Sequence, residues 1–190
     1  MNVISAAKAF NQRARTEQWH MACDPTLAFS DNFHPRFLEI WRNKAGTRKM
    51  PARSEMTLRD LKDYLRHIVL AQRDDDNPHT YRWRLIGTSM TDVIGHNTGK
   101  SFEESIPNEH LQRWNGVCDM VLDSEQPWRF LGHVHIRGRE YLKAENLYLP
   151  LTNDEGSPAF IMGVCRYTPR IQDNDNFNED EIFSLPGALR

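Results

Sequence analysis

A pair of histidines one residue apart, His133 and His135, is the arrangement in this chain that comes nearest to a metal site. Alternate side chains of a β-strand point to the same face, so an HxH pair brings two imidazoles together. The large apolar residues of the same stretch occupy the other positions: Trp128, Phe130, Val134 and Ile136. We therefore expect the apolar side chains to enter the core and both imidazoles to point away from it, and we predict no bound metal.

Three carboxylates are candidates for a general base: Asp119, Asp123 and Glu145. Asp119 and Asp123 lie one helical turn apart and flank the apolar stripe of their predicted helix, so we expect both in solvent. The sequence contains no GxSxG, HExxH, P-loop or GxGxxG motif. It therefore predicts no catalytic residues. The alternative is a small, cone-shaped α+β enzyme in which one carboxylate acts as the base.

The cysteines Cys23, Cys118 and Cys165 are far apart and odd in number, which argues against a disulfide framework and against a CxxC metal site. Cys118 and Cys165 lie within apolar patterns, so we interpret them as small buried hydrophobic residues.

The remaining chemistry is apolar. Large or polarizable side chains from several predicted elements would form a cup between a sheet and its helices. We predict that this cup binds a small apolar or aromatic ligand; the alternative is that the same side chains only fill the core. The predicted ligand-binding residues are Trp83, Leu85, Met90, Phe102, Trp114, Cys118, Phe130 and Met162.

Residues 81–102, YRWRLIGTSMTDVIGHNTGKSF, must position several of these side chains. Tyr81, Trp83 and Leu85 alternate with arginines, which is typical of a strand with one buried face. Gly87 ends the strand, and the residues after it predict short helices separated by glycine turns. A strand that leads directly into short helices fits a sheet with a pocket between itself and a helical layer.

The rest of the chain supplies further helices and strands. Helical periodicity or capping signals mark residues 3–15, 30–46, 57–65 and 107–124, and strand patterns mark residues 67–72, 79–88, 128–137, 141–151 and 159–168. This order predicts a five-stranded antiparallel sheet with its short helices and one long helix inserted after the second strand. We divide the chain into an extension (1–29), a domain with its N-terminal helices (30–168) and a tail (169–190).

The helix predicted over residues 30–46 has an apolar stripe of large side chains: Phe33, Phe37, Ile40 and Trp41. Either the back of the sheet or a second copy of the chain must cover it. The stripe therefore suggests a homodimer formed through the helix that carries Phe37 and Trp41, or through the outer face of the sheet.

Charge and hydropathy limit the other partners. The net charge is −2, and no long basic run occurs, which argues against binding to nucleic acid or to an anionic membrane. No apolar run approaches the ~20 residues of a membrane span, and the N-terminus lacks the apolar centre of a secretory signal. The sequence predicts a cytoplasmic protein.

Several landmarks occur in a characteristic order: Trp41, Pro51, Arg53, the 81–102 segment, and Leu149-Pro150-Leu151 before an Asp-Glu-Gly turn. With this order and spacing, residues 33–167 resemble the single-domain PAS proteins of alphaproteobacteria. The resemblance implies a PAS-like α+β fold, in which short helices and one long helix cover one face of a five-stranded antiparallel sheet.

The same resemblance implies a stand-alone sensory or adaptor module in bacterial signalling, which binds a small ligand or a protein partner without catalysis. No kinase, cyclase or DNA-binding segment follows it, so we expect output through an unidentified signalling protein. Haem-binding PAS proteins usually use a histidine on or just before the long helix, where His96 and His110 are the candidates; PAS light sensors need a cysteine where this chain has residues 96–99. We predict no cofactor. A purely structural interaction domain with a filled interior is the further alternative.

Overall fold

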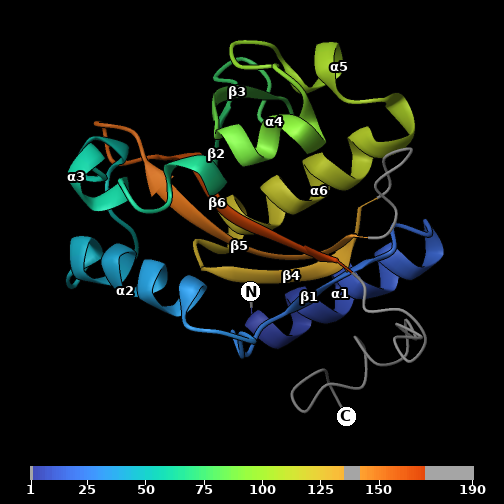
Figure 1. Ribbon diagram of the computed structural model, residues 1–190, viewed down its shortest axis with the longest axis horizontal. Coiled ribbons are helices and arrows are strands. Elements are labelled where there is room, and N and C mark those ends of the chain that lie inside the picture. The colour runs from blue at the N-terminus through green and yellow to red at the C-terminus, as the bar shows by residue number, and fades with distance from the viewer. Residues whose placement is uncertain (1, 135–141, 170–190) are drawn as a thin grey trace.

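The computed structural model describes residues 2–134 and 142–169 of the chain. Its centre is an antiparallel sheet with helices packed on both faces (Figure 1). The six strands that the described residues form follow the order β1-β4-β5-β6-β2-β3 across the sheet. Their bounds are β1 (Met21–Asp24), β2 (Ile68–Arg73), β3 (Tyr81–Ile86), β4 (Trp128–His133), β5 (Leu142–Thr152) and β6 (Pro158–Pro169).

The five strands expected from the sequence are β2 to β6, and β2 and β3 form the predicted hairpin. Strand β1 corrects the prediction of a five-stranded sheet, because it pairs with β4 and forms an additional edge. It is four residues long and a proline follows it, so it shows no readable alternation. Gly132 of β4 permits this close pairing, since a Cβ there would lie 2.8 Å from the carbonyl oxygen of His20.

The helices confirm most of the predicted pattern. They are α1 (Val3–Thr16), α2 (Phe33–Ala45), α3 (Leu58–Leu61), α4 (Thr88–Ile94), α5 (Phe102–Ser105) and α6 (Asn108–Ser124), with 3-10 turns η1 (Arg53–Glu55) and η2 (Leu65–His67). Helices α4 to α6 are inserted between β3 and β4, as expected. The helix expected over residues 57–65 is divided between α3 and η2. Throughout the described ranges, every helix is too short or too polar to cross a bilayer.

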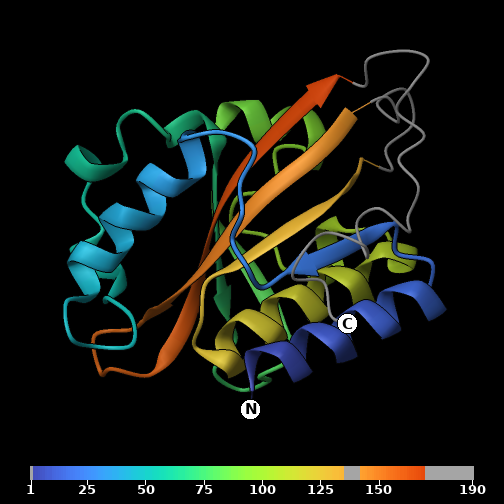
Figure 2. The same cartoon turned by 90° about the horizontal axis from the view of Figure 1, so that it is seen from below.

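One face of the sheet carries α4, α5 and α6, and α1 packs beside α6 (Figures 1 and 2). Large aromatic groups fill the interior there. The Phe102 ring lies 4.4 Å from Trp83, and the Phe130 ring lies 5.2 Å from Phe10 of α1 in an edge-on arrangement. The N-terminal helix is therefore docked on the body of the domain through its Phe10 face.

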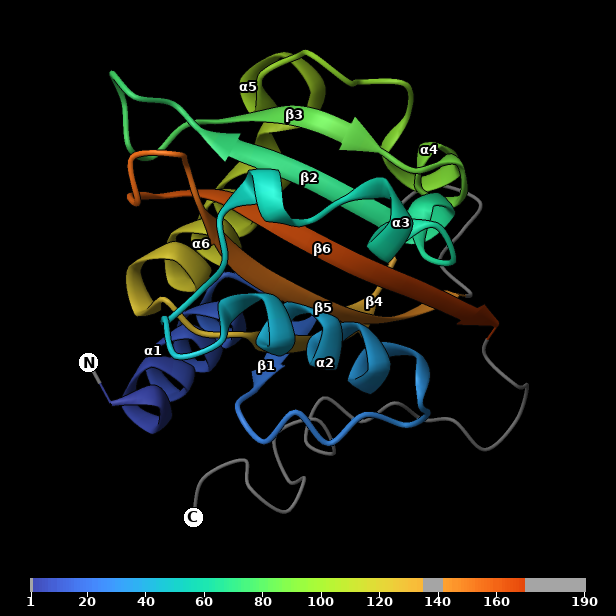
Figure 3. The same cartoon turned by 90° about the vertical axis from the view of Figure 1, so that its left-hand side faces the viewer.

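The opposite face carries α2 and α3, which stand in front of the sheet in Figure 3 with α6 behind it. Phe37 and Trp41 of α2 are buried against this face, and the indole Nε1 of Trp41 donates a hydrogen bond of 2.9 Å to the carbonyl oxygen of Pro150. The apolar stripe of α2 is therefore covered by the chain's own sheet. Of the two covers expected for this stripe, the structure shows the back of the sheet, so Phe37 and Trp41 are not open to a second copy; a homodimer through another surface stays a prediction.

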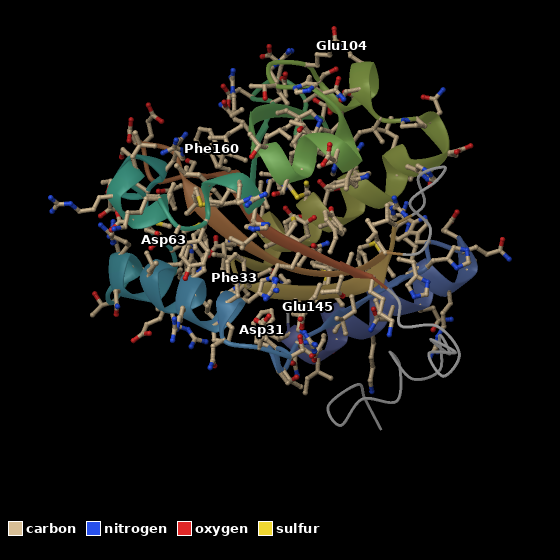
Figure 4. All side chains as sticks on the ribbon, viewed as in Figure 1. Asp31, Phe33, Asp63, Glu104, Glu145 and Phe160 are labelled. Atoms are coloured by element: carbon tan, nitrogen blue, oxygen red, sulfur yellow. The ribbon has the colours of Figure 1, made fainter. Side chains whose placement is uncertain are left out.

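A buried ionic network ties the edge of the sheet to the connection between β1 and α2. Arg129 of β4 donates hydrogen bonds to Asp24 (2.6 Å) and to Glu145 of β5 (2.7 Å). Asp31 pairs with Arg166 of β6. Figure 4 shows Asp31 and Glu145 near one another beside the sheet, with Glu104 of α5 far from them. These contacts hold the start of α2 against the sheet.

His34 lies within this network and is fully buried, with its ring stacked on Phe29 at 4.9 Å. Among the described residues, neither ring nitrogen has a hydrogen-bond partner of normal geometry, although the backbone of Val164 is close enough to influence the ring, and Nδ1 lies 3.9 Å from Asp31. Burial lowers the pKa of His34; Arg166 acts in the same direction, and Glu145 and Asp31 oppose it. His34 is therefore neutral in the folded protein at neutral pH.

We expect this histidine to make the protein less stable in mild acid. Because its folded-state pKa lies below the unfolded value near 6.5, the unfolded chain binds more protons, and the free energy of unfolding falls as the pH drops from 6.5 toward the folded pKa. Urea unfolding of wild type and of His34→Leu should show a smaller pH slope in the variant across this window. His96→Leu, which removes an exposed imidazole after α4, serves as the control. Equal slopes in wild type and His34→Leu would contradict this assignment.

Candidate ligand-binding site

A cavity of about 500 Å³ lies between α6 and the sheet. Its volume is within the range of small-molecule sites. The apolar part of its lining comes mainly from α4, α6 and the connection before α6: Val93, Ile94, Ile106, Pro107, Trp114 and Val117. The polar part comes from α6 and the strands: Glu109, His110, Arg113, Asn146, Tyr148 and Tyr167. The space is thus an apolar chamber with a limited set of polar groups.

Helical spacing explains the α6 wall of this cavity. His110, Arg113, Trp114 and Val117 stand at positions i, i+3, i+4 and i+7, so they share one face of the helix. Cys118, further toward the core, is buried beside this face. The helix therefore presents a cation and an indole to the cavity next to its buried stripe.

Strand register explains the floor. Paired residues of antiparallel strands point to the same face. One row across the sheet is Gly132–Ala144–Tyr167, and the next is Phe130–Asn146–Cys165. Gly132 and Ala144 add almost no bulk, which leaves room above this part of the floor. The cavity therefore lies where two small residues face α6.

Arg113 is the principal charge of the cavity. Its Nη1 donates a hydrogen bond of 3.3 Å to the carbonyl oxygen of Trp19, in the connection between α1 and β1. Burial lowers the pKa of Arg113, while Tyr148 and Tyr167 act in the opposite direction. An arginine nevertheless remains protonated in a protein. Burial also raises the pKa of both tyrosines well above 10, so their hydroxyl groups stay protonated.

Asn146 is the buried polar group of the floor, with 9% of its surface exposed. Its Oδ1 has no hydrogen-bond partner in the part of the chain that the structure describes. Its neighbours on the adjacent strands are Phe130 and Cys165. A phenyl ring offers no hydrogen bond and a thiol only a weak one, so neither satisfies the amide. A buried carboxamide of this kind usually finds a partner, because leaving it unpaired costs about 1–3 kcal/mol.

The rim of the cavity is more polar. Glu109 is largely exposed, and its carboxylate lies 3.6 Å from Nε2 of His110. His133, at the end of β4, is half-buried and lies among the cavity-lining residues rather than free in solvent. In the unbroken register of β4, His133 alternates with Phe130 and Gly132, which face α6, so His133 is on the opposite face of the strand, as expected; His135 lies outside the described residues. The described residues contain no cluster of three or more His, Cys, Asp and Glu side chains that could hold a metal.

The structure divides the eight residues predicted to bind a ligand. Trp114 lines the cavity. Five others belong to the core cluster on the same face of the sheet: Trp83, Met90, Phe102, Cys118 and Phe130. Leu85 and Met162 belong to the core on the opposite face, beneath α2. A ligand role for the eight stays a prediction, but the structure does not bring all of them to one cup.

A β-bulge moved Leu85 to the other face. Leu70 pairs with Leu85, while the next residue, Ala71, pairs with Trp83, so Arg84 is an extra residue in β3. One inserted residue reverses the alternation, and Leu85 therefore faces away from Trp83. Met162 was misplaced for a different reason: β6 is apolar on both faces, and alternation cannot say which side carries the helices.

The three candidate bases also lie away from the cavity. Asp119 accepts a hydrogen bond from the Tyr81 hydroxyl at 2.5 Å and lies 3.2 Å from Nδ1 of His79. Asp123 is exposed and pairs with Arg73. Glu145 belongs to the ionic network on the α2 side. None of the three lines the cavity.

The cysteines are buried and form no disulfide, as expected, and burial raises the pKa of Cys165 to about 12.

Sequence reasoning missed most of the polar part of the cavity; of its polar side chains on α6, only His110 was singled out, as a candidate haem ligand. Arg113 lies next to Trp114 and outside the apolar stripe of the helix, so the helical pattern gives no sign of a buried cation. Alternation along β5 offered a signal, since Ala144, Asn146 and Tyr148 share one face. The apolar run after Asn146 concealed it.

Comparison with known proteins identifies the family. A family model described as a PAS domain matches residues 32–166, well over half of the chain. The chain therefore belongs to the PAS domain family. PAS domains are generally sensory modules of signal transduction and generally lack catalytic activity. No curated protein matches the chain.

Solved structures give weaker similarities. A sensory box histidine kinase/response regulator from Burkholderia thailandensis E264 is 14% identical with a TM-score of 0.38, and the match covers 66% of this chain and 92% of that one. The PAS-B domain of a tryptophan-to-alanine variant of Drosophila melanogaster Cycle, with bound glycerol, is 17% identical with a TM-score of 0.34 and covers 53% and 99%.

Proposed function

We propose that this protein is a cytoplasmic PAS sensory module that binds a small molecule between α6 and the sheet and signals to a partner protein without catalysis. The observation that carries the proposal is the cavity of about 500 Å³ with its few polar groups. A filled interior would have favoured a purely structural interaction domain. A carboxylate base buried within the cavity would have favoured an enzyme; Asp119, Asp123 and Glu145 do not line it, and Glu109, which does, lies at the rim with its side chain 77% exposed.

A route for the signal starts at the cavity wall. Arg113 contacts the carbonyl oxygen of Trp19, and Trp19 packs tightly on α6, since a Cβ at Gly116 would lie 3.2 Å from its ring. Arg13 of α1 also donates to Gln112 of α6 at 3.5 Å. A ligand that binds more tightly to one position of α6 than to another would therefore shift the packing of α1. The size of that shift in free energy equals the difference between the ligand's binding free energies for the two positions of α6. We place the output on this helix and its surroundings.

Filling the cavity should abolish ligand binding. Ala144 lies on the floor, and phenylalanine there would occupy the space above it. Native mass spectrometry of purified wild-type protein should reveal a retained small molecule that is released on denaturation, and Ala144→Phe should carry none. Ala9→Phe, on the exposed side of α1, should keep it. A retained molecule that is equally abundant in Ala144→Phe would overturn the proposal, as would wild-type protein that neither retains nor rebinds a component of a cell metabolite extract.

A further inference from the structure

We propose that Arg113 binds the carboxylate of a small, singly charged organic acid whose apolar body occupies the cavity. This inference rests on the proposed function and specifies its ligand class. It depends on three features of the cavity: the unused donors of Arg113, the unpaired amide of Asn146, and the balance of charge among the lining residues.

Arg113 has more hydrogen-bonding capacity than the fold uses. A guanidinium presents five N–H donors in a planar fork, which matches the two oxygens of a carboxylate. The carbonyl oxygen of Trp19 accepts from Nη1 alone. Within the described residues, the other donors have no partner, and no carboxylate of the chain pairs with this arginine. A half-buried cation without an internal anion is suited to an anion from outside.

Asn146 provides a second, independent indication of a ligand. Its side chain lines the same cavity, is more than nine-tenths buried, and has an Oδ1 without a partner. A polar group of the ligand would satisfy this amide. The hydroxyl groups of Tyr148 and Tyr167, which line the cavity beside Arg113, are available as neutral donors to the same ligand.

The balance of charge favours a carboxylate over a phosphate. Arg113 is the only permanent cation among the described residues that line the cavity. The rim imidazole of His110 faces Glu109, whose carboxylate would repel a dianion. Apolar side chains of α4 and α6 form the rest of the wall, where a second negative charge would lose its hydration without compensation. A monoanion with an apolar body fits all of these conditions.

Pairs of probe ligands test, in the intact chain, whether Arg113 binds the carboxylate; this contact is called the anchor. Isothermal titration calorimetry would compare phenylacetate with phenylacetamide, and hexanoate with hexanamide, because each pair differs in charge but hardly in shape. We expect the carboxylates to bind roughly 10- to 100-fold more tightly, which is the range for hydrogen bonds to a charged group. Arg113→Met should remove this preference and change the affinity for the amides by less than about threefold. Arg113→Lys should retain part of the preference.

Arg59→Met, which removes an exposed arginine of α3 on the other side of the sheet, is the matched control and should behave as wild type. Equal affinity of wild type for an acid and its amide would overturn the anchor, and this comparison needs no variant to fold. Tighter binding of phenyl phosphate than of phenylacetate would overturn the carboxylate assignment. If amides and acids bind equally and Ala144→Phe blocks both, Arg113 does not bind the carboxylate but the proposed function stands; if neither binds, the organic-acid assignment is contradicted, and the native mass spectrometry of wild type and Ala144→Phe decides the proposed function.

Discussion

Replacing Arg129 with methionine is expected to lower the free energy of unfolding by about 3–5 kcal/mol, because it leaves buried carboxylates without their cation. Arg129 and Asp24 are 6% and 4% exposed, and the Glu145 side chain is 13% exposed. The arginine donates to both carboxylates at 2.6–2.7 Å. Methionine has similar length, so most of the loss would be electrostatic.

Urea unfolding of a matched set of variants measures this effect. Arg82→Met removes an arginine of β3 whose side chain is 41% exposed and which lies 4.0 Å from Glu104, so it should cost less than about 1 kcal/mol. Adding Asp24→Asn and Glu145→Gln to Arg129→Met should recover a substantial part of the stability, since no buried charge would then remain. If Arg129→Met lowers the free energy of unfolding by no more than Arg82→Met does, then Arg129, Asp24 and Glu145 do not form a buried ionic network in solution.

Phe130→Ala on its own is expected to lower the free energy of unfolding by about 3–5 kcal/mol, because it removes a fully buried ring from the core. Phe130 is 0% exposed and makes edge-on contacts with Phe10 of α1 at 5.2 Å and with Tyr148 of β5 at 5.5 Å. The change would leave an internal void that the rigid sheet cannot close. It would also loosen α1, which rests on this ring.

Thermal and chemical unfolding would measure the loss of stability in Phe130→Ala, and amide hydrogen exchange would measure the loosening of α1. Leu58→Ala, at a side chain that is 73% exposed, should change the free energy of unfolding by less than about 0.5 kcal/mol. In Phe130→Ala, the amides of α1 should exchange faster than those of α2, which packs on the other face. A loss of ligand affinity in Phe130→Ala without a loss of stability would instead make Phe130 a ligand contact, as the sequence first suggested.

Local sequence patterns predicted the elements of the PAS fold well. The alternation from Tyr81 to Trp83 located β3, and the stripe at Cys118, Val121 and Leu122 located α6. These signals are strong because each element buries one face. The short edge strand β1 escaped prediction because its pairing with β4 depends on Gly132, which is distant in sequence.

The candidate site was less predictable, for two physical reasons. A bulge at Arg84 reverses the facing of Leu85, and nothing in the local pattern reveals an inserted residue. A cavity also depends on what is missing: Gly132 and Ala144 leave space only because they are opposite each other in register. Large aromatic residues such as Trp83 and Phe102 were predicted to line the cup, whereas the structure places them in contact with one another within the core.

The most direct test of the cavity between α6 and the sheet is a nuclear Overhauser measurement on methyl-labelled protein. The neutral probe phenylacetamide would make the result independent of Arg113. Its ring protons are predicted to contact the methyl groups of Ile106 and Val117, which line the cavity, and not those of Ile68 and Leu149, which lie beneath α2. Contacts with Ile68 and Leu149, or with neither pair of residues, would contradict the proposed site.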